Sequence, residues 1–177
     1  PLGPSTVDAD SLAPRTQSLD DSAALGEAMH RVLEWFSGPL GRSHPLLQLC
    51  ASAAQMYGLD KRRSERLQAA VQAILSSADC APLFDPQALL WAGNEVPVAW
   101  EGQDMRIDRL VQLREPDGVP SWWVLDYKLN AEPQRDADYR EQLERYRRAV
   151  SALQPGERVR TFFITSQGRL IESAAPG

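Results

Sequence analysis

Hydrophobic residues recur every three or four positions through the first half of the chain, which is the spacing of one face of an α-helix. The pattern predicts a first helix that begins near Asp20 or Asp21 and ends at Gly38-Pro39. Two more helices are expected in the same half, and Asp60 is placed to cap the second of them. Their expected ranges are 46–57 and 61–77.

After Pro86 the pattern changes to short, alternating runs that are typical of β-strands. Three such runs form an expected meander, and a long amphipathic helix and two further strands follow. We expect a right-handed crossover through this helix, so that the strand after it lies parallel to the strand before it. The expected strands are 95–100, 105–113, 121–128, 159–165 and 168–172, and the expected helix is 136–153.

This order of elements predicts an α/β fold with a mixed central sheet, flanking helices and an N-terminal helical segment. Residues 1–20 are polar and without periodicity, so we expect a disordered tail or linker there, followed by a single domain over residues 21–177. Residues 1–5 resemble a remnant of expression cloning. We therefore expect the chain to be a fragment of a longer protein.

The composition fits a soluble globular domain. The 177 residues are 43% hydrophobic and 24% charged, and no apolar run approaches the length of a membrane span. The net charge of -5 argues against a free-standing, high-affinity DNA binder, although it permits an active site to which a partner delivers DNA. Cys50 and Cys80 are too few for a four-thiolate metal site, and we expect incidental thiols in a reducing cytoplasm.

Candidate chemistry is concentrated at the end of the expected strand 121–128. Asp126 and Lys128 are two positions apart and therefore point to the same face of that strand. A carboxylate buried at the end of an apolar strand is costly unless a cation accompanies it. The sequence therefore predicts that Asp126 has a cationic partner.

A second carboxylate, Asp108, lies on the preceding strand. Strand alternation places it opposite an apolar stripe formed by Ile107, Val111 and Leu113. A hairpin symmetric about Asp117 would set Asp108 directly opposite Asp126, with Cβ atoms roughly 4.5–5.5 Å apart. Two carboxylates this close repel each other unless a divalent cation or a proton lies between them, and oxygen ligands suit Mg²⁺ or Mn²⁺. A salt-bridged lysine between two surface aspartates would produce the same spacing.

The segments 106–111 and 124–128 together resemble the active-site motif of PD-(D/E)XK nucleases. The version of the motif is similar to that in the C-terminal nuclease domains of RecB- and AddA-type helicase–nucleases. The resemblance covers about residues 22–172 and implies a restriction-endonuclease-like core. It also implies that Asp108, Asp126 and the carbonyl of Tyr127 bind Mg²⁺ or Mn²⁺, and that Lys128 positions or activates the attacking water.

Three further segments match the family in the expected order. The segment 25–34 resembles its first helix, which implies that His30 reaches the metal, with Gly26 leaving space above the imidazole. The segment 95–98 resembles the acidic strand before the first metal-binding aspartate, although Glu95 is equally compatible with a solvent-facing position. The segment 142–146 resembles a Q-x-x-x-Y element. Tyr146 lies on the apolar stripe of its helix and is expected to pack in the core, whereas Gln142 is expected to make a polar contact near the site.

The resemblance implies a metal-dependent DNA nuclease from a bacterial helicase–nuclease of DNA repair or recombination, with a helicase module as its partner. There are departures from the family pattern: Leu129-Asn130 replaces a common threonine, and the four cysteines of iron–sulfur members are absent, so no iron–sulfur cluster is expected. No phosphate-binding loop of an ATPase occurs in the chain. Two alternatives stay open, namely an inert nuclease-like module that holds DNA or docks a protein, and a metal-dependent hydrolase of RNA or nucleotides.

Overall fold

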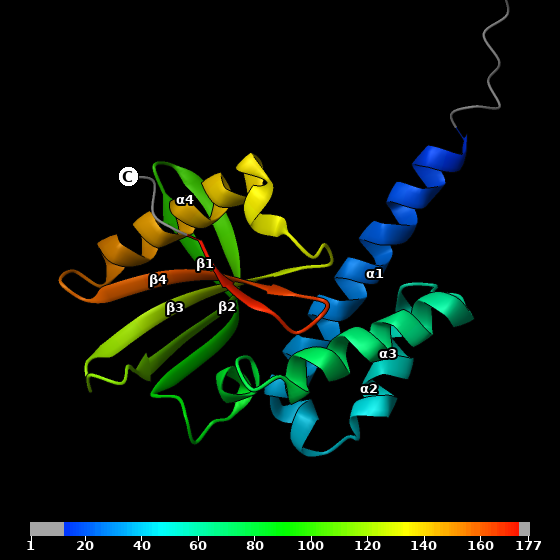
Figure 1. Cartoon of the computed structure of the whole chain (residues 1–177), viewed down its shortest axis with the longest axis horizontal. Helices are drawn as coiled ribbons and strands as arrows, with labels where there is room; N and C mark the ends of the chain where they lie inside the picture. Colours follow the sequence, from blue (N-terminus) through cyan, green and yellow to red (C-terminus); the bar gives the residue numbers. More distant parts are fainter. Residues whose placement is uncertain (1–12, 174–177) are drawn as a thin grey trace, which may run out of the picture.

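A computed structural model describes residues 13–173, with side chains from residue 20 onward. It contains four α-helices, three short 3-10 helices and five strands (Figure 1). In chain order the elements are α1 (Ala13–Ser37), η2 (Pro39–Arg42), α2 (Leu46–Met56), α3 (Lys61–Ser76), η3 (Ala81–Phe84), β1 (Trp91–Trp100), β2 (Gln103–Arg114), β3 (Pro120–Lys128), η4 (Pro133–Arg135), α4 (Ala137–Leu153), β4 (Arg158–Thr165) and β5 (Leu170–Glu172).

The strands form one mixed sheet in the order β1-β2-β3-β4-β5. Only β3 and β4 run parallel, and α4 connects them, as the sequence predicts. The other neighbouring pairs are antiparallel. The expected fold, a mixed sheet flanked by helices with an N-terminal helical segment, is confirmed.

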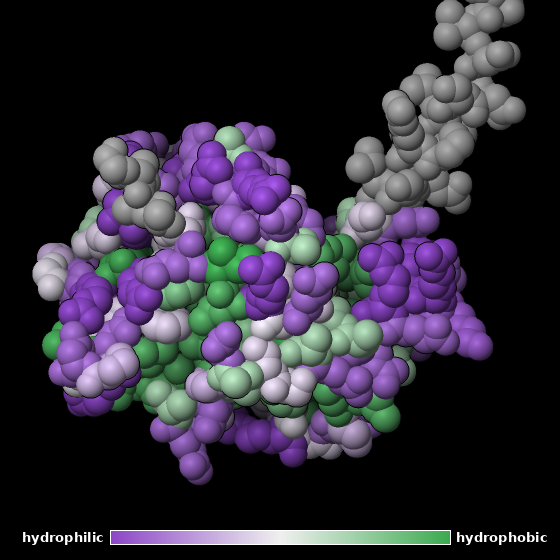
Figure 2. Space-filling view, viewed as in Figure 1, coloured by the Kyte–Doolittle hydropathy of each residue, from purple (hydrophilic) through white to green (hydrophobic). Residues whose placement is uncertain are grey.

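The sheet lies between two layers of helices, with α4 on one face and the group α1, α2 and α3 on the other (Figure 1). Each face has its own core because successive strand residues point in opposite directions. Leu125 and Phe162 pack under α1–α3, whereas their neighbours Val124 and Phe163 pack under α4. Hydrophilic residues cover α4 and α3, and hydrophobic residues lie between them over the sheet (Figure 2).

The first helix begins at Ala13 rather than near Asp20 or Asp21. The expectation of a disordered tail is therefore wrong for residues 13–20, and residues 1–12 lie outside the described part of the chain. Extending an existing helix adds about one backbone hydrogen bond for each residue ordered, so this extension needs no apolar stripe of its own. Pro14 is tolerated because it stands in the first turn, where its missing N–H has no helical partner.

The other predicted boundaries hold to within a few residues. The side chain of Asp60 accepts a hydrogen bond of 2.8 Å from the Arg63 N–H and caps α3, as expected. The largest difference is in β1, which begins at Trp91 instead of Glu95. Gly93 and Asn94 have low strand propensity, but pairing with β2 outweighs it. None of the described helices has the length and apolarity that crossing a membrane requires.

The regular pleat of β2 is broken at Asp108. Ile107 is fully buried under α4 with Leu110, whereas Val111 is buried under α1–α3. The predicted single stripe of Ile107, Val111 and Leu113 is therefore wrong at Ile107. Strict alternation fails because Asp108 has no ladder partner on β1 or on β3, so the backbone can twist at this position.

Candidate functional site

The β2–β3 hairpin has the register that the sequence predicts. Each paired position is symmetric about Asp117, and the ladder ends at Arg109 and Leu125. One step further the same register would set Asp108 opposite Asp126, but no backbone pair joins these two positions. Instead, Oδ2 of Asp108 accepts a hydrogen bond of 2.9 Å from the backbone N–H of Tyr127. The carboxylate thus replaces a ladder hydrogen bond and is held at the point where the two strands diverge.

Asp126 and Lys128 form a buried ion pair at the end of β3. Oδ2 of Asp126 lies 2.7 Å from Nζ of Lys128, and the aspartate side chain is only 2% exposed. The same Oδ2 atom accepts no well-directed hydrogen bond within residues 20–173. Nζ of Lys128 also lies 4.4 Å from the centre of the Tyr139 ring, at the start of α4. The lysine is therefore held between a carboxylate and an aromatic face.

The long helix α1 brings His30 to the same end of the hairpin. Its Nδ1 atom lies 3.5 Å from Oδ1 of Asp108, and its Nε2 atom donates a 3.1 Å hydrogen bond to the carbonyl of Tyr127. Leu25, Met29 and other apolar residues of α1 are buried beneath the helix and fix its rotation. The structure therefore brings together three of the residues singled out in the sequence, although they come from α1, β2 and β3.

Gly26 lies one helical turn before His30, and the two residues line the same groove. A Cβ atom at this position would lie 3.6 Å from the side chain of Leu129, which is an ordinary van der Waals contact. The backbone geometry around the site therefore does not require glycine here. The role of Gly26 in leaving space above the imidazole stays a prediction.

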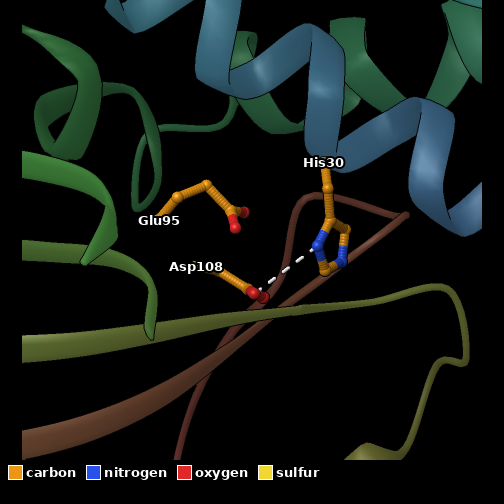
Figure 3. A group of neighbouring side chains, drawn as sticks. All are labelled: His30, Glu95 and Asp108. Carbon is orange, nitrogen blue, oxygen red and sulfur yellow. Dashed lines mark ion pairs between the residues drawn. The ribbon is translucent and has the colours of Figure 1, made fainter. Parts of the chain in front are cut away.

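Glu95 belongs to a cluster of two acidic side chains and one histidine that could hold a metal ion. Nitrogen and carboxylate oxygen atoms of His30, Glu95 and Asp108 all lie within 4.8 Å of one another, and their side chains converge from α1, β1 and β2 (Figure 3). Glu95 has a left-handed backbone with φ of 49°, which costs roughly 1–3 kcal/mol for a residue with a side chain. Its carboxylate also lies 3.7 Å from Arg106. The interpretation of Glu95 as simply solvent-facing is wrong, because the residue is half-buried and turned toward His30.

The electrostatics around Asp108 are unfavourable for a free carboxylate. Burial raises its pKa to about 6, and the negative charge of Asp126 acts in the same direction. His30 and the N–H of Tyr127 oppose this change without cancelling it. A divalent cation beside these carboxylates would remove the repulsion.

Gln142 and Tyr146 face each other across one turn of α4. Nε2 of Gln142 donates a hydrogen bond of 3.0 Å to the hydroxyl of Tyr146, whose ring is buried in the core under α4, as predicted. Burial raises the pKa of Tyr146 to about 12, and the nearby charge of Asp126 adds to this effect. The tyrosine therefore keeps its proton near Asp126 at neutral pH.

Two hollows meet at His30. A smaller one of about 260 Å³ lies beside Glu95 and Glu34. A larger groove of about 610 Å³ runs from the end of β3 past α1 to α3. Its lining includes His30, Tyr127, Lys128, Tyr139 and, from α3, Arg66. Lys128 and the carbonyl of Tyr127 are therefore reachable by a ligand in the larger groove.

The donor set suits a small divalent cation. Carboxylate and carbonyl oxygens with one imidazole are typical ligands of Mg²⁺ or Mn²⁺. The ligand atoms of His30, Glu95 and Asp108 all lie within 4.8 Å of one another, so one ion could reach all three. Oδ2 of Asp126 is not part of this group, and it is held by Nζ of Lys128 at 2.7 Å. The residues present therefore fit a metal ion.

The sequence did not indicate the polar residues that support this group. Tyr139 lies within the predicted helix 136–153 but was not singled out, yet its ring lies against Lys128. Asn94 and Arg109 were not singled out. Nη1 of Arg109 donates a hydrogen bond of 2.6 Å to Oδ1 of Asn94, beside Glu95 and Asp108. Their positions next to the two acids were visible in the sequence, but the contact depends on the pairing of β1 with β2.

The comparisons with known proteins agree with the geometry. The family model described as the PD-(D/E)XK nuclease superfamily matches residues 7–175, and no curated protein matches the chain. The acids Asp108 and Asp126 and Lys128 stand on adjacent strands of a restriction-endonuclease-like sheet within the matched range. With nearly the whole chain matched, this protein belongs to the PD-(D/E)XK nuclease superfamily.

Proposed function

We propose that this chain is a Mg²⁺- or Mn²⁺-dependent DNA nuclease domain of the RecB/AddA-like type. Membership in the superfamily indicates phosphodiester hydrolysis in general terms. The single observation that carries the proposal is the convergence of His30, Glu95 and Asp108 beside the buried Asp126–Lys128 pair. Carboxylates, an imidazole and a lysine at one groove end are the groups that metal-assisted hydrolysis needs.

In this proposal Asp108, Asp126, His30 and the carbonyl of Tyr127 hold the metal, and Glu95 is a further ligand or orients one through water. When bound, the ion supplies Lewis-acid chemistry and lowers the pKa of water. The raised pKa of Asp108 supports this assignment because it reflects a charge that the metal-free protein leaves poorly compensated. To bind metal, His30 must be neutral and one of its nitrogens must exchange its present contact for the ion.

Lys128 is proposed to act on the phosphate and the attacking water. Its ammonium group is held by Asp126 on one side and by the ring of Tyr139 on the other, so its position is defined. A point charge at that place can stabilise the negative charge that develops on the phosphate oxygens. Gln142 is proposed to assist by holding Tyr146 beside Asp126.

The larger groove is proposed to receive the DNA strand. It ends at Lys128 and His30, and Arg66 of α3 lines it together with the start of α1. A phosphate backbone in the groove would pass from Arg66 toward the metal ligands. The net charge of -5 supports weak intrinsic affinity, so we propose that a helicase module of the parent protein delivers the strand.

Cleavage assays test the proposal. Purified protein is incubated with single- and double-stranded DNA, RNA and nucleotides, with Mg²⁺, with Mn²⁺ or with EDTA. We expect DNA cleavage that requires metal and that is abolished by Asp108→Ala and by Asp126→Ala. Preferential cleavage of RNA or nucleotides would favour the other hydrolase, and DNA binding without cleavage of any substrate would favour an inert module.

A further inference from the structure

A buried arginine lies directly beside the acidic group and has no acidic partner of its own. Arg109 is 3% exposed, and within the described residues it forms no ion pair with a carboxylate. Its Nε donates to the carbonyl of Leu83 at 3.0 Å, and its guanidinium stacks 4.9 Å from the centre of the Phe84 ring. A buried cation of this kind is costly and needs a compensating role.

The strongest contact of Arg109 is with Asn94. Nη1 of the arginine donates to Oδ1 of Asn94 at 2.6 Å, and the two residues are cross-strand partners on β2 and β1. The amide nitrogen of Asn94 donates in turn to the hydroxyl of Ser37 at 2.9 Å and to the carbonyl of Glu34 at 3.4 Å. One chain of hydrogen bonds thus joins η3, β2, β1 and the end of α1.

This network is placed next to all three residues of the acidic group. Asn94 directly precedes Glu95, and Arg109 directly follows Asp108. The cross-strand pair Asn94–Arg109 is the last regular pair before the β1–β2 ladder breaks at Glu95 and Asp108. Ser37 stands two helical turns after His30 and on the same side of α1. The network therefore fixes the backbone on both sides of the break and the rotation of the helix above it.

We infer that Asn94 and Arg109 are positioning residues that hold Glu95, Asp108 and His30 at ligand spacing. The inference rests on the proposed metal-dependent function. The left-handed backbone of Glu95 persists only where its neighbours determine it, and Asn94 is bound on three sides immediately before it. Residues that orient metal ligands typically change metal affinity by about 10- to 100-fold when they are lost.

The test measures Mn²⁺ binding by titration calorimetry on the full chain without DNA, under conditions in which circular dichroism reports a folded protein. Asn94→Leu removes the amide contacts, and Ser37→Ala removes only the link to α1. We expect the Kd for Mn²⁺ to rise about 10-fold or more in Asn94→Leu and about threefold in Ser37→Ala. The matched control is Gln112→Leu, which removes an amide on β2 that bonds to Glu157 at 3.0 Å. Its Kd should stay within twofold of the unmodified chain.

A second arm shows whether Asn94 acts through Glu95. In a Glu95→Gln background, Asn94→Leu should raise the Kd by a smaller factor than in the unmodified chain, since the part of its effect that acts through the Glu95 carboxylate is lost. If Asn94→Leu does not fold, Ser37→Ala carries the comparison. Unchanged Mn²⁺ affinity in the folded variants, or an equal loss in Gln112→Leu, would overturn the positioning role. A failure of the unmodified chain to bind Mn²⁺ would instead overturn the proposed function, and the inference with it.

Discussion

Nδ1 of His30 on α1 lies 3.5 Å from Oδ1 of Asp108 on β2, while Nε2 of the same ring contacts the carbonyl of Tyr127 on β3. Figure 3 shows the His30 ring reaching from α1 to the carboxylate of Asp108. His30→Ala is therefore expected to weaken Mn²⁺ binding by about 10-fold or more and to reduce DNA cleavage in parallel. The fold should persist because the buried apolar residues of α1 are unchanged.

The matched control for His30→Ala is His44→Ala, which changes an imidazole whose contacts are local to residues 40–44. Calorimetry with Mn²⁺ and a cleavage assay give the two readouts. Equal metal affinity in His30→Ala and the unmodified chain would remove His30 from the metal site.

Asp108→Asn should stabilise the metal-free protein at neutral pH while it abolishes Mn²⁺ binding. The pKa of Asp108 is raised from 3.8 to about 6, so the folded state holds this proton more tightly than the unfolded state. The contribution to stability is favourable below about pH 4 and is lost as the pH rises to about 6. At about 1.4 kcal/mol for each pKa unit, the loss is about 3 kcal/mol.

Urea unfolding in EDTA at several pH values measures this effect. The two proteins should have equal unfolding free energies near pH 4, and Asp108→Asn should be the more stable above pH 6. Mn²⁺ affinity of the unmodified chain should fall as the pH is lowered through 6, because a protonated carboxyl is a poor ligand. A variant that is less stable than the unmodified chain at pH 8 would contradict the prediction.

Lys128→Met is expected to stop cleavage and to reduce stability. Removing the ammonium leaves the buried carboxylate of Asp126 without its partner, which should lower the unfolding free energy in EDTA by about 3–5 kcal/mol. Mn²⁺ binding should largely persist, since lysine is not a ligand. Lys61→Met, which changes an exposed lysine at the start of α3, is the control and should alter neither property. Near-normal cleavage by Lys128→Met would assign the lysine to a purely structural ion pair.

Arg66→Glu should weaken DNA binding without loss of metal affinity. Arg66 stands on α3 and lines the larger groove, so a glutamate at this position places a negative charge on the proposed strand path. We expect about a 10-fold rise in the Kd for a short single-stranded oligonucleotide in Ca²⁺ buffer, and a shallower salt dependence of binding. Fluorescence anisotropy over a salt series provides the measurement.

Arg42→Glu is matched to Arg66→Glu because it makes the same change in net charge at an exposed arginine that lines a different hollow. Its oligonucleotide affinity should change by less than threefold. Equal losses in the two variants would show that only net charge matters and that the groove is not the strand path.

The sequence alone was enough to predict most of the scaffold, because its signals are local. Helical periodicity, the cap at Asp60 and the turn about Asp117 depend on nearby residues, and they determined α3, the β2–β3 register and the parallel placement of β4. The pairing of Asp126 with Lys128 also follows from local strand geometry. The start of α1 at Ala13 was missed because helix propagation beyond the apolar stripe leaves no pattern to detect.

The details of the site were decided by tertiary structure. Ile107 packs in the core under α4 because the β-ladder is interrupted at Asp108. The alternation of apolar and polar residues along a strand does not predict such an interruption. Glu95 joined His30 and Asp108 because β1 pairs with β2 and α1 crosses above them. The contact between Asn94 and Arg109 likewise exists only across two strands. Such contacts join residues far apart in the chain, and their geometry depends on how layers pack, which no local pattern of residues specifies.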